Sequence, residues 1–309
     1  MKKKLLPELM TIVIVVIMVL MSEIFKEREF IFPEITALAV GAWLAPKQVW
    51  KTNRIKLVIL ISLYAIFGVI LVRYVNIDIY FEVILGFVVC LFGLYVSKTT
   101  FAPLISAMIL PIIINSESWL YPIFATIMAI MVVLGQKFLE KYEYRHDYKY
   151  ILVENNLKDT LYLNIQRIGA LMIVAFIAFE LSLPFLIAPP IIVAFVELSS
   201  NHPKLRSQVI KLLVLVFVMT FIGAYGRLLF SEIYKLPLTF SAMVSVIIMI
   251  IMMKGLKLYF PPAGALAILP LLIETDKLII YPFVVTSGFI IFIIIAFIIT
   301  KTPISVITK

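Results

Sequence analysis

Two proline-bounded segments, 159 positions apart, contain the residues whose types and spacing could bind a small solute. Proline is tolerated in the first turn of a helix but breaks or kinks the helix further along, so residues 101–111 and 260–270 each predict a short helix between two breaks. The N-terminus of such a helix carries a partial positive charge, which suits an anion or the negative end of a small solute. The candidate binding residues in these segments are Phe101, Pro103, Ser106, Phe260, Pro261, Pro262 and Gly264.

Carboxylates within apolar runs form a second group of candidates, because charge inside a membrane is unfavourable and tends to be functional there. Glu34 follows a proline at the start of one run, and Glu197 lies towards the end of another. Both are candidates for the same binding site. The alternative is that each side chain reaches to the membrane surface. This alternative is stronger for Glu82, Arg73 and Arg227, which lie close to predicted helix ends.

The sequence contains no pattern typical of an enzyme. It has neither GxGxxG nor GxxxxGK[ST] nor HExxH, and its two histidines fall in predicted loops. The single cysteine, Cys90, lies in an apolar run, so there is no disulfide framework or cysteine-based metal site. We therefore expect no catalytic residue, no metal and no cofactor. An enzyme acting on lipid would require Glu34, Glu180 and Glu197 to converge in one cavity.

The elements that must position these residues are apolar helices. The chain of 309 residues is 63% hydrophobic and 15% charged, with a mean hydropathy of +1.11, whereas soluble domains are roughly 45–50% apolar. These values predict an all-α membrane protein, a polytopic helical bundle with about twelve hydrophobic segments in two six-segment repeats. The predicted segments are 5–25, 30–46, 56–75, 79–97, 101–115, 119–136, 168–184, 185–200, 208–230, 237–254, 259–273 and 278–300.

The distribution of basic residues predicts the topology. With the N-terminus inside, twelve crossings place 21 of the 27 Lys and Arg residues on one side, as is typical of cytoplasmic loops. We expect a multi-pass protein of the cell membrane with both termini in the cytoplasm. Anionic lipid headgroups then explain the net charge of +9 without any nucleic acid. If the short proline segments were re-entrant instead, the basic stretch 137–167 would face outward, against the charge rule.

The two halves of the chain predict an internal repeat. Besides the prolines, Lys56 corresponds to Lys211 and Gly68 to Gly223. The predicted units are a first membrane repeat, 1–136, a basic, tyrosine-rich cytoplasmic or interfacial linker, 137–167, and a second membrane repeat, 168–309. Prolines and a lysine in register favour duplication over the general likeness of apolar helices. Matched proline-interrupted segments in two halves are typical of transport sites.

The run Phe260-Pro261-Pro262-Ala263-Gly264 resembles the signature of the HPP family of integral membrane proteins, a His-Pro-Pro sequence followed by small residues. The resemblance covers residues 185–300, with a more degenerate copy at 30–136. Phe260 stands where the family has its histidine. Some relatives are linked to nitrite transport, so the resemblance implies a small-anion transporter.

Two hypotheses follow for the function. The first is a transporter or channel for a small solute, such as the small anion nitrite, which uses the two proline segments packed face to face. The second is a non-transporting membrane scaffold or assembly subunit whose short helices only pack. A water-accessible cavity between residues 101–111 and 260–270 would favour the first, and dry packing would favour the second. The expected partners are the lipid bilayer, a small-molecule or ion substrate and further copies of the chain in a homo-oligomer.

Overall fold

Within the described residues, 5–146, 150, 152–153, 156–200 and 203–301, the computed structural model contains helices and no strand. Eight helices are long and apolar enough to cross a membrane, which confirms the prediction of an all-α membrane bundle. They are α1 (Leu5–Phe25), α3 (Arg54–Tyr74), α4 (Ile79–Ser97), α6 (Leu120–Lys141), α7 (Leu157–Glu180), α10 (Val209–Gly226) with its π-helical extension η5 (Arg227–Ile233), α11 (Leu238–Leu256) and α13 (Tyr281–Lys301).

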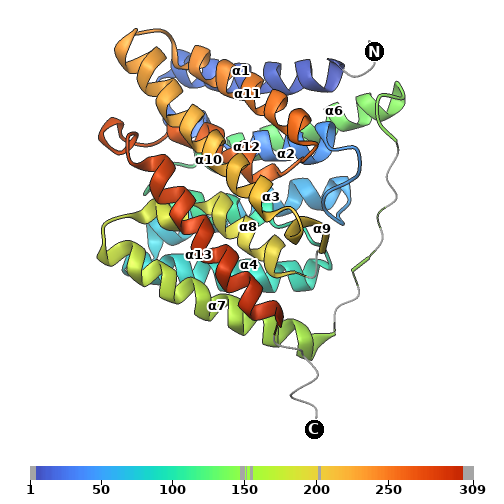
Figure 1. The fold of residues 1–309 in the computed structure, drawn as a ribbon, viewed down its shortest axis with the longest axis vertical. Coiled ribbons are helices and arrows are strands. Elements are labelled where there is room, and N and C mark those ends of the chain that lie inside the picture. Colours follow the sequence, from blue (N-terminus) through green and yellow to red (C-terminus); the bar gives the residue numbers. More distant parts are fainter. Residues whose placement is uncertain (1–4, 147–149, 151, 154–155, 201–202, 302–309) are drawn as a thin grey trace.

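The other four predicted segments contain shorter helices, so eight helices of the described residues, rather than twelve, reach the length of a membrane span. The shorter helices are α2 (Glu34–Ala39), which continues as the π-helical η3 (Val40–Leu44), α5 (Pro103–Ile113), α8 (Pro189–Ser199), which follows the 3₁₀ turn η4 (Pro184–Ile187), and α12 (Pro261–Ile268), which continues as η6 (Leu269–Leu271). Every residue of α2, α5 and α12, and every residue of α8 except Glu197, is buried. Figure 1 shows α2, α8 and α12 inside the bundle, with α1, α7 and α13 at its outside. The remaining short elements are η2 (Arg28–Phe30), α9 (Pro203–Arg206) and η7 (Thr275–Lys277).

The long helices carry the exposed apolar surface of the molecule. Phe92 of α4, Ile173 of α7 and Ile251 of α11 are each more than 60% exposed, and similar side chains lie on the other long helices. Such a surface is unfavourable in water and suits the hydrocarbon core of a bilayer. The long helices therefore form a shell between lipid and the short helices.

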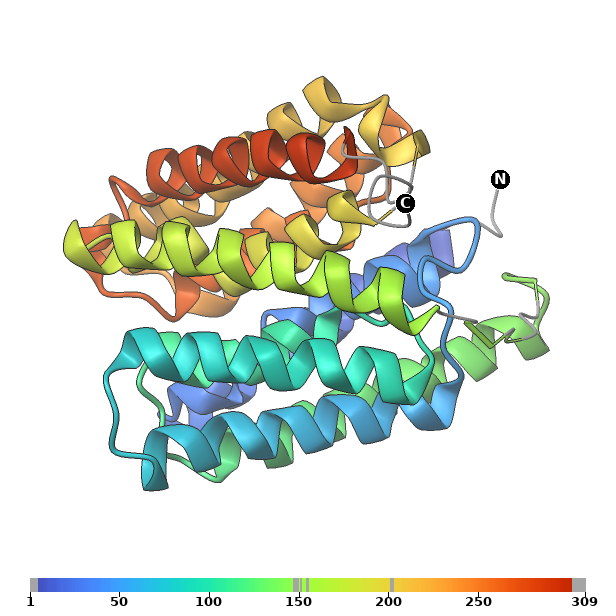
Figure 2. The same cartoon turned by 90° about the horizontal axis from the view of Figure 1, so that it is seen from below.

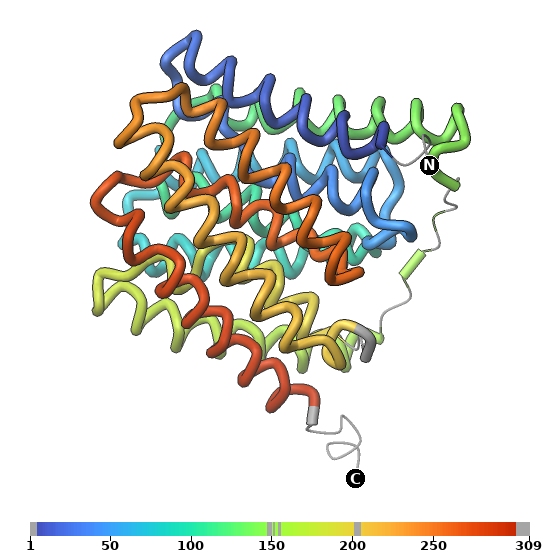
Figure 3. Tube along the Cα trace, turned by 45° about the horizontal axis from the view of Figure 1, so that its top comes forward, coloured from blue at the N-terminus to red at the C-terminus, as the bar shows by residue number. Residues whose placement is uncertain are grey.

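The helices of the shell run in alternate directions. At the end of the bundle where α1 begins, Glu8 of α1 forms an ion pair with Lys254 of α11. At the opposite end, the Glu23 carboxylate of α1 accepts a hydrogen bond of 2.5 Å from the Thr239 hydroxyl of α11. The two helices lie side by side in Figure 3, and α7 lies beside α4 in Figure 2. We refer to the end that holds the starts of α1, α3, α7 and α10 as the basic end.

The described part of the expected linker, residues 137–167, includes the last turn of α6 and the first turns of α7. Arg145, which follows α6, donates hydrogen bonds to the carbonyl oxygens of Ala45, at 2.8 Å, and Gly41, at 3.3 Å. Burial lowers the pKa of Arg145 to about 10, so its guanidinium remains charged at neutral pH. Both chain termini, residues 1–4 and 302–309, whose cytoplasmic placement we expected, lie outside the described residues.

Candidate functional site

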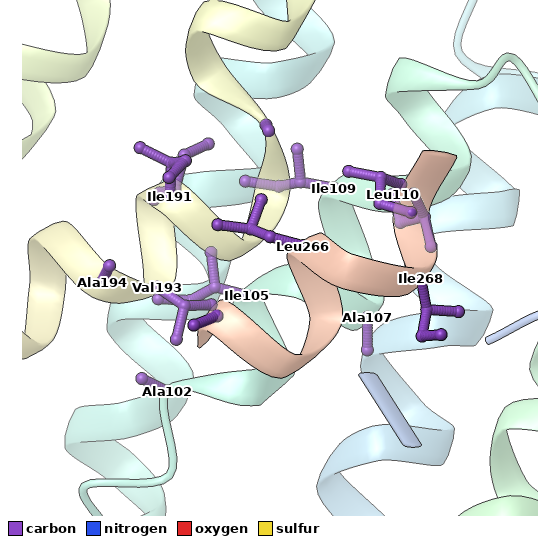
Figure 4. Packing of buried hydrophobic residues seen from close by; sticks show 14 of the residues in the cluster. Ala102, Ile105, Ala107, Ile109, Leu110, Ile191, Val193, Ala194, Leu266 and Ile268 are labelled. Atoms are coloured by element: carbon purple, nitrogen blue, oxygen red, sulfur yellow. The ribbon is translucent and has the colours of Figure 1, made fainter. Parts of the chain in front are cut away.

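The starts of the four short helices meet at one place in the interior, which we name the central junction. Its lining residues are Glu34 and Ala37 of α2, Pro103 and Ser106 of α5, Pro190 and Val193 of α8, Pro261, Pro262 and Ala265 of α12, and Trp50 from the loop before α3. Within it α2 packs against α12, and α5 packs against α8. Figure 4 shows apolar side chains of α5, α8 and α12, among them Ile105, Val193 and Leu266, gathered in this interior.

The junction is closed and nearly filled. The cavity leaves about 10 Å³ for the centre of a water molecule, which is room for roughly one water. Gly264 allows this tight packing, because a Cβ there would lie 3.2 Å from the Met249 sulfur and 3.4 Å from the Thr36 carbonyl carbon. The small residue predicted at this position thus lets α2 approach α12.

A buried carboxyl group lies at the junction. Glu34, the first residue of α2, is 1% exposed, and its Oε1 accepts a hydrogen bond from the Ser106 hydroxyl of α5. Its Oε2 has no hydrogen-bond partner among the described residues. Among the residues that the structure describes, no Lys, Arg or His lines the junction. A buried acceptor without a donor is unfavourable by about 1–3 kcal/mol, so this oxygen calls for an explanation beyond packing.

The first-turn amides of the short helices are not free, contrary to our expectation from the sequence. Two prolines open both α8 and α12 and remove two N–H groups from each helix. The next N–H group of each helix donates to a carbonyl just before the helix. The Ala263 N–H of α12 donates to the Phe260 carbonyl at 3.1 Å, and the Ile191 N–H of α8 donates to the Ala188 carbonyl at 2.7 Å. In α5, the Ile105 N–H donates to the Ala102 carbonyl at 3.0 Å. The prolines that open these helices therefore leave few backbone donors for an anion.

A large cavity leads from the basic end to the junction. This vestibule has a volume of about 930 Å³ and is lined by residues 45–50 and 257–261 with Thr100, Glu197, Leu205, Gln208 and Lys254. Trp50 and Pro261 line both the vestibule and the junction, so they form the wall between the two spaces.

Three contacts hold Trp50 in this wall. Its indole N–H donates a hydrogen bond of 2.9 Å to Glu197 Oε1 of α8. The Phe101 ring packs edge-on against it with ring centres 5.3 Å apart. On its other side the ring covers Gly41, where any Cβ would overlap the indole. A shift of the short helices would therefore move the wall.

All nine candidate residues lie at or next to the junction. Glu34, Pro103, Ser106, Pro261 and Pro262 line it, Gly264 lies in the α2–α12 contact, Phe260 and Glu197 border the vestibule, and Phe101 supports Trp50. The sequence analysis missed Trp50, Ala37, Pro190 and Val193. The Pro189-Pro190 pair was a visible signal for a third short helix. Glu180 is exposed at the end of α7 and does not line the junction.

Buried arginines hold the far ends of two short helices. Arg227 donates to the carbonyl oxygens of Pro270, at 2.6 Å, and Ile273, at 2.5 Å, beyond α12. Arg167 donates to the Val196 carbonyl at the end of α8 at 2.9 Å. A cation at a helix C-terminus offsets the negative end of the dipole. Arg227 is 7% exposed and is also paired with Glu232 of η5, so its side chain is held by protein groups at this end of the bundle.

Comparison with models of known protein families, with curated proteins and with solved structures finds no match for this chain. The fold itself defines the class, a multi-pass helical membrane protein with short helices buried inside a shell of long ones. The resemblance to the HPP family rests on the short run that begins at Phe260.

Proposed function

We propose that the chain is a transporter or channel for a small solute, with its binding site at the central junction. The observation that carries this proposal is that short helices from both halves of the chain meet where a vestibule of about 930 Å³ ends. Transport sites lie at the interface of internal repeats and are built from interrupted helices. In this proposal each half crosses the membrane six times, with each short helix as part of a crossing.

Matched contacts in the two halves support the repeat. A Cβ on Gly68 of α3 would overlap the Met108 carbonyl of α5, and a Cβ on Gly223 of α10 would overlap the Ala267 carbonyl of α12. Contacts between the halves are also exchanged as a two-fold axis requires: α1 packs on α11 and α7 on α4, while α2 packs on α12 and α8 on α5.

The lining of the junction follows the same relation. Two pairs of lining residues from α2 and α8 are 156 positions apart: Glu34 with Pro190, and Ala37 with Val193. Two pairs from α5 and α12 are 159 positions apart: Pro103 with Pro262, and Ser106 with Ala265. Eight of the lining residues thus form four corresponding pairs. This pairing supports a pseudo-two-fold axis through the junction.

The vestibule favours an anionic solute. Its described lining carries Lys47 and Lys257, together with Lys254, which is paired with Glu8 of α1, and a single carboxylate, Glu197. Clefts lined by one sign of charge raise the local concentration of the opposite ion. The small junction favours a solute of few atoms, and nitrite, the ion suggested by the resemblance to the HPP family, is the first probe. The basic end faces the cytoplasm of the cell in this proposal.

A non-transporting scaffold is the second candidate, and the closed packing of the junction favours it. Transport requires that the junction opens towards the vestibule, whereas a scaffold requires that it stays filled. The two functions therefore differ in a measurable property of the same residues.

Uptake into proteoliposomes tests the proposal. We expect the wild type to carry at least one of a panel of small anions that includes nitrite. Ala265→Leu, and to a smaller degree Ala265→Val, should block uptake because both side chains fill the junction. Gly169→Leu is the control, since no atom lies within 4 Å of a Cβ at that position. Uptake by Ala265→Leu at the wild-type rate would place the site elsewhere, and a wild type that carries no solute would favour the scaffold.

A further inference from the structure

The carboxyl group of Glu34 has surroundings that suit a proton better than a charge. It is 1% exposed, one oxygen is bonded to the Ser106 hydroxyl, and the other lacks a partner within the described chain. No other residue that lines the junction titrates in the physiological range. In the neutral form of Glu34, the oxygen next to Ser106 stays hydrogen-bonded, because the serine hydroxyl can donate to or accept from a carboxyl group. Only an uncharged, carbonyl-type oxygen then lacks a partner.

Within the described residues, the helices packed against α2 bring no cation to Glu34. Neither α5, α12 nor η3 contains a titratable side chain in the physiological range. From α6 the near group is Tyr121, whose hydroxyl donates to the Ala107 carbonyl at 3.0 Å, and the charged residues of α6 lie in its last two turns. From α1 the carboxylates are Glu8, paired with Lys254, and Glu23, bonded to Thr239. An ionised Glu34 would thus be desolvated without a counter-ion.

The starts of the neighbouring helices do not replace a counter-ion. Prolines and local hydrogen bonds use up the first-turn N–H groups of α8 and α12, so the dipoles of these helices act without direct donors. A dipole at a helix start contributes less than the desolvation of a buried ion removes.

We propose that Glu34 is a proton-binding site and that the solute crosses the membrane together with one proton, an inference that rests on the proposed transport function. A proton from water binds a carboxylate oxygen of Glu34 when the junction opens, and it leaves from the same oxygen when the solute leaves. A small anion next to an ionised carboxylate would be strongly repelled at low dielectric. The anion therefore binds when Glu34 is neutral, and by linkage the anion also favours the bound proton.

The stoichiometry follows from the comparison of the two halves. The residue of α8 that corresponds to Glu34 is Pro190, and the residue of α12 that corresponds to Ser106 is Ala265. The described part of the second half supplies no carboxyl group to the junction. One proton per solute is therefore expected.

Infrared spectroscopy of the purified protein tests the proton site without any transport. At neutral pH we expect a carbonyl band of a protonated carboxyl group that disappears in Glu34→Gln, shifts in Ser106→Ala and persists in Glu197→Gln. The glutamine variant retains the size of the side chain, so its folding can be checked by gel filtration. A wild-type spectrum that equals the Glu34→Gln spectrum over the titrated pH range would overturn the proton site.

Uptake of nitrite and the other anions of the panel tests the coupling. A proton gradient directed with the solute should accelerate wild-type uptake at least several-fold, and uptake by Glu34→Gln should ignore the gradient. Thr286→Val, which removes a buried unpaired hydroxyl outside the junction, should respond like the wild type. Wild-type uptake that ignores the proton gradient, or that follows a sodium gradient instead, would overturn the coupling but leave transport intact. If no solute is carried, transport and coupling both fail, while the carboxyl band still decides the proton site.

Discussion

In the first half of the molecule, Glu34 of α2 is hydrogen-bonded to Ser106 of α5. At the corresponding positions of the second half, Pro190 of α8 and Ala265 of α12 have no side-chain polar atoms to share. Both pairs line the same junction, so they experience the same neighbouring helices. The apolar residues Pro190 and Ala265 are sufficient to fill the space at the junction. The polar pair of Glu34 and Ser106 is not needed for packing, and we therefore assign it a function.

Contacts away from the junction are nearly the same in the two halves. The Tyr121 hydroxyl donates to the Ala107 carbonyl at 3.0 Å, and the Tyr281 hydroxyl donates to the Leu266 carbonyl at 3.2 Å. The first bond joins α6 to α5, and the second joins α13 to α12. In the proposed repeat, the matched contacts hold the short helices in place, and the unmatched residues Glu34 and Ser106 are the ones proposed to act at the junction.

Two arginines near the ends of α3 and α10 give the largest expected difference in stability between the halves. Arg227→Ala leaves two buried carbonyl oxygens without a donor and should lower the free energy of unfolding by about 3 kcal/mol. Arg73→Ala removes one exposed bond of 3.3 Å to the Glu117 carbonyl and should change stability by less than about 0.5 kcal/mol. Denaturant unfolding in detergent measures both. Equal losses would contradict the burial described for Arg227.

Substitutions at Gly68 of α3 and Gly223 of α10 should change the stability of the protein alike. Gly68→Ala forces a Cβ against a carbonyl of α5, and Gly223→Ala forces a Cβ against a carbonyl of α12. Each should destabilise the protein by about 1–3 kcal/mol. Gly169→Ala and Gly255→Ala are matched controls with open space around the Cβ, and they should be neutral or stabilising by up to about 1 kcal/mol. Unfolding curves of the four variants sharpen the comparison. Tolerance of alanine at one of the first two positions alone would break the proposed repeat.

Removing the hydroxyl of Tyr121 or of Tyr281 should lower the free energy of unfolding by similar amounts, which are smaller than those expected for the glycine variants. Tyr121→Phe and Tyr281→Phe each delete one buried hydrogen bond, which is worth about 1 kcal/mol. The double variant should show the sum of the two losses, because the bonds lie in different halves. Thermal unfolding of the single and double variants measures this. A strong departure from additivity would indicate that the two bonds depend on one another.

The smallest effect has the opposite sign. Lys98 and Lys257 end α4 and α11 in the left-handed conformation, each with φ of 52°. Glycine adopts this conformation without strain, so Lys98→Gly and Lys257→Gly should each stabilise the protein by up to about 1 kcal/mol. Melting temperatures provide the readout. A loss of stability in either variant would show that its lysine side chain contributes more than its backbone strain removes.

Much of the helical framework could be predicted because its signals are local. Prolines at the start of α5 and α12 and the apolar runs of the long helices appear directly in the sequence. Pro111 does not end α5, which continues through it to Ile113, since it packs against the notch left by Gly68. A tertiary contact thus outweighs a local break.

The junction could be predicted only in part. Spacing identified two of the four short helices, but it could not show that their first N–H groups are bonded locally or that α2 and α8 complete the cluster. Trp50 carries no motif, and its place in the wall depends on contacts with Glu197 and Phe101 from distant parts of the chain. Long-range packing of this kind has no signature in a single sequence.

The labelling rate of a cysteine at position 265 tests the central claim most directly. In a Cys90→Ala background, Lys47→Cys in the vestibule should react with a small, charged thiol reagent added at the basic end, and it serves as the control. Ala265→Cys should react from the same side more slowly, as the junction opens, and a transported anion should slow the reaction further. If Ala265→Cys remains unreactive from both sides while Lys47→Cys is labelled, the junction does not open, and the proposed transport site is contradicted.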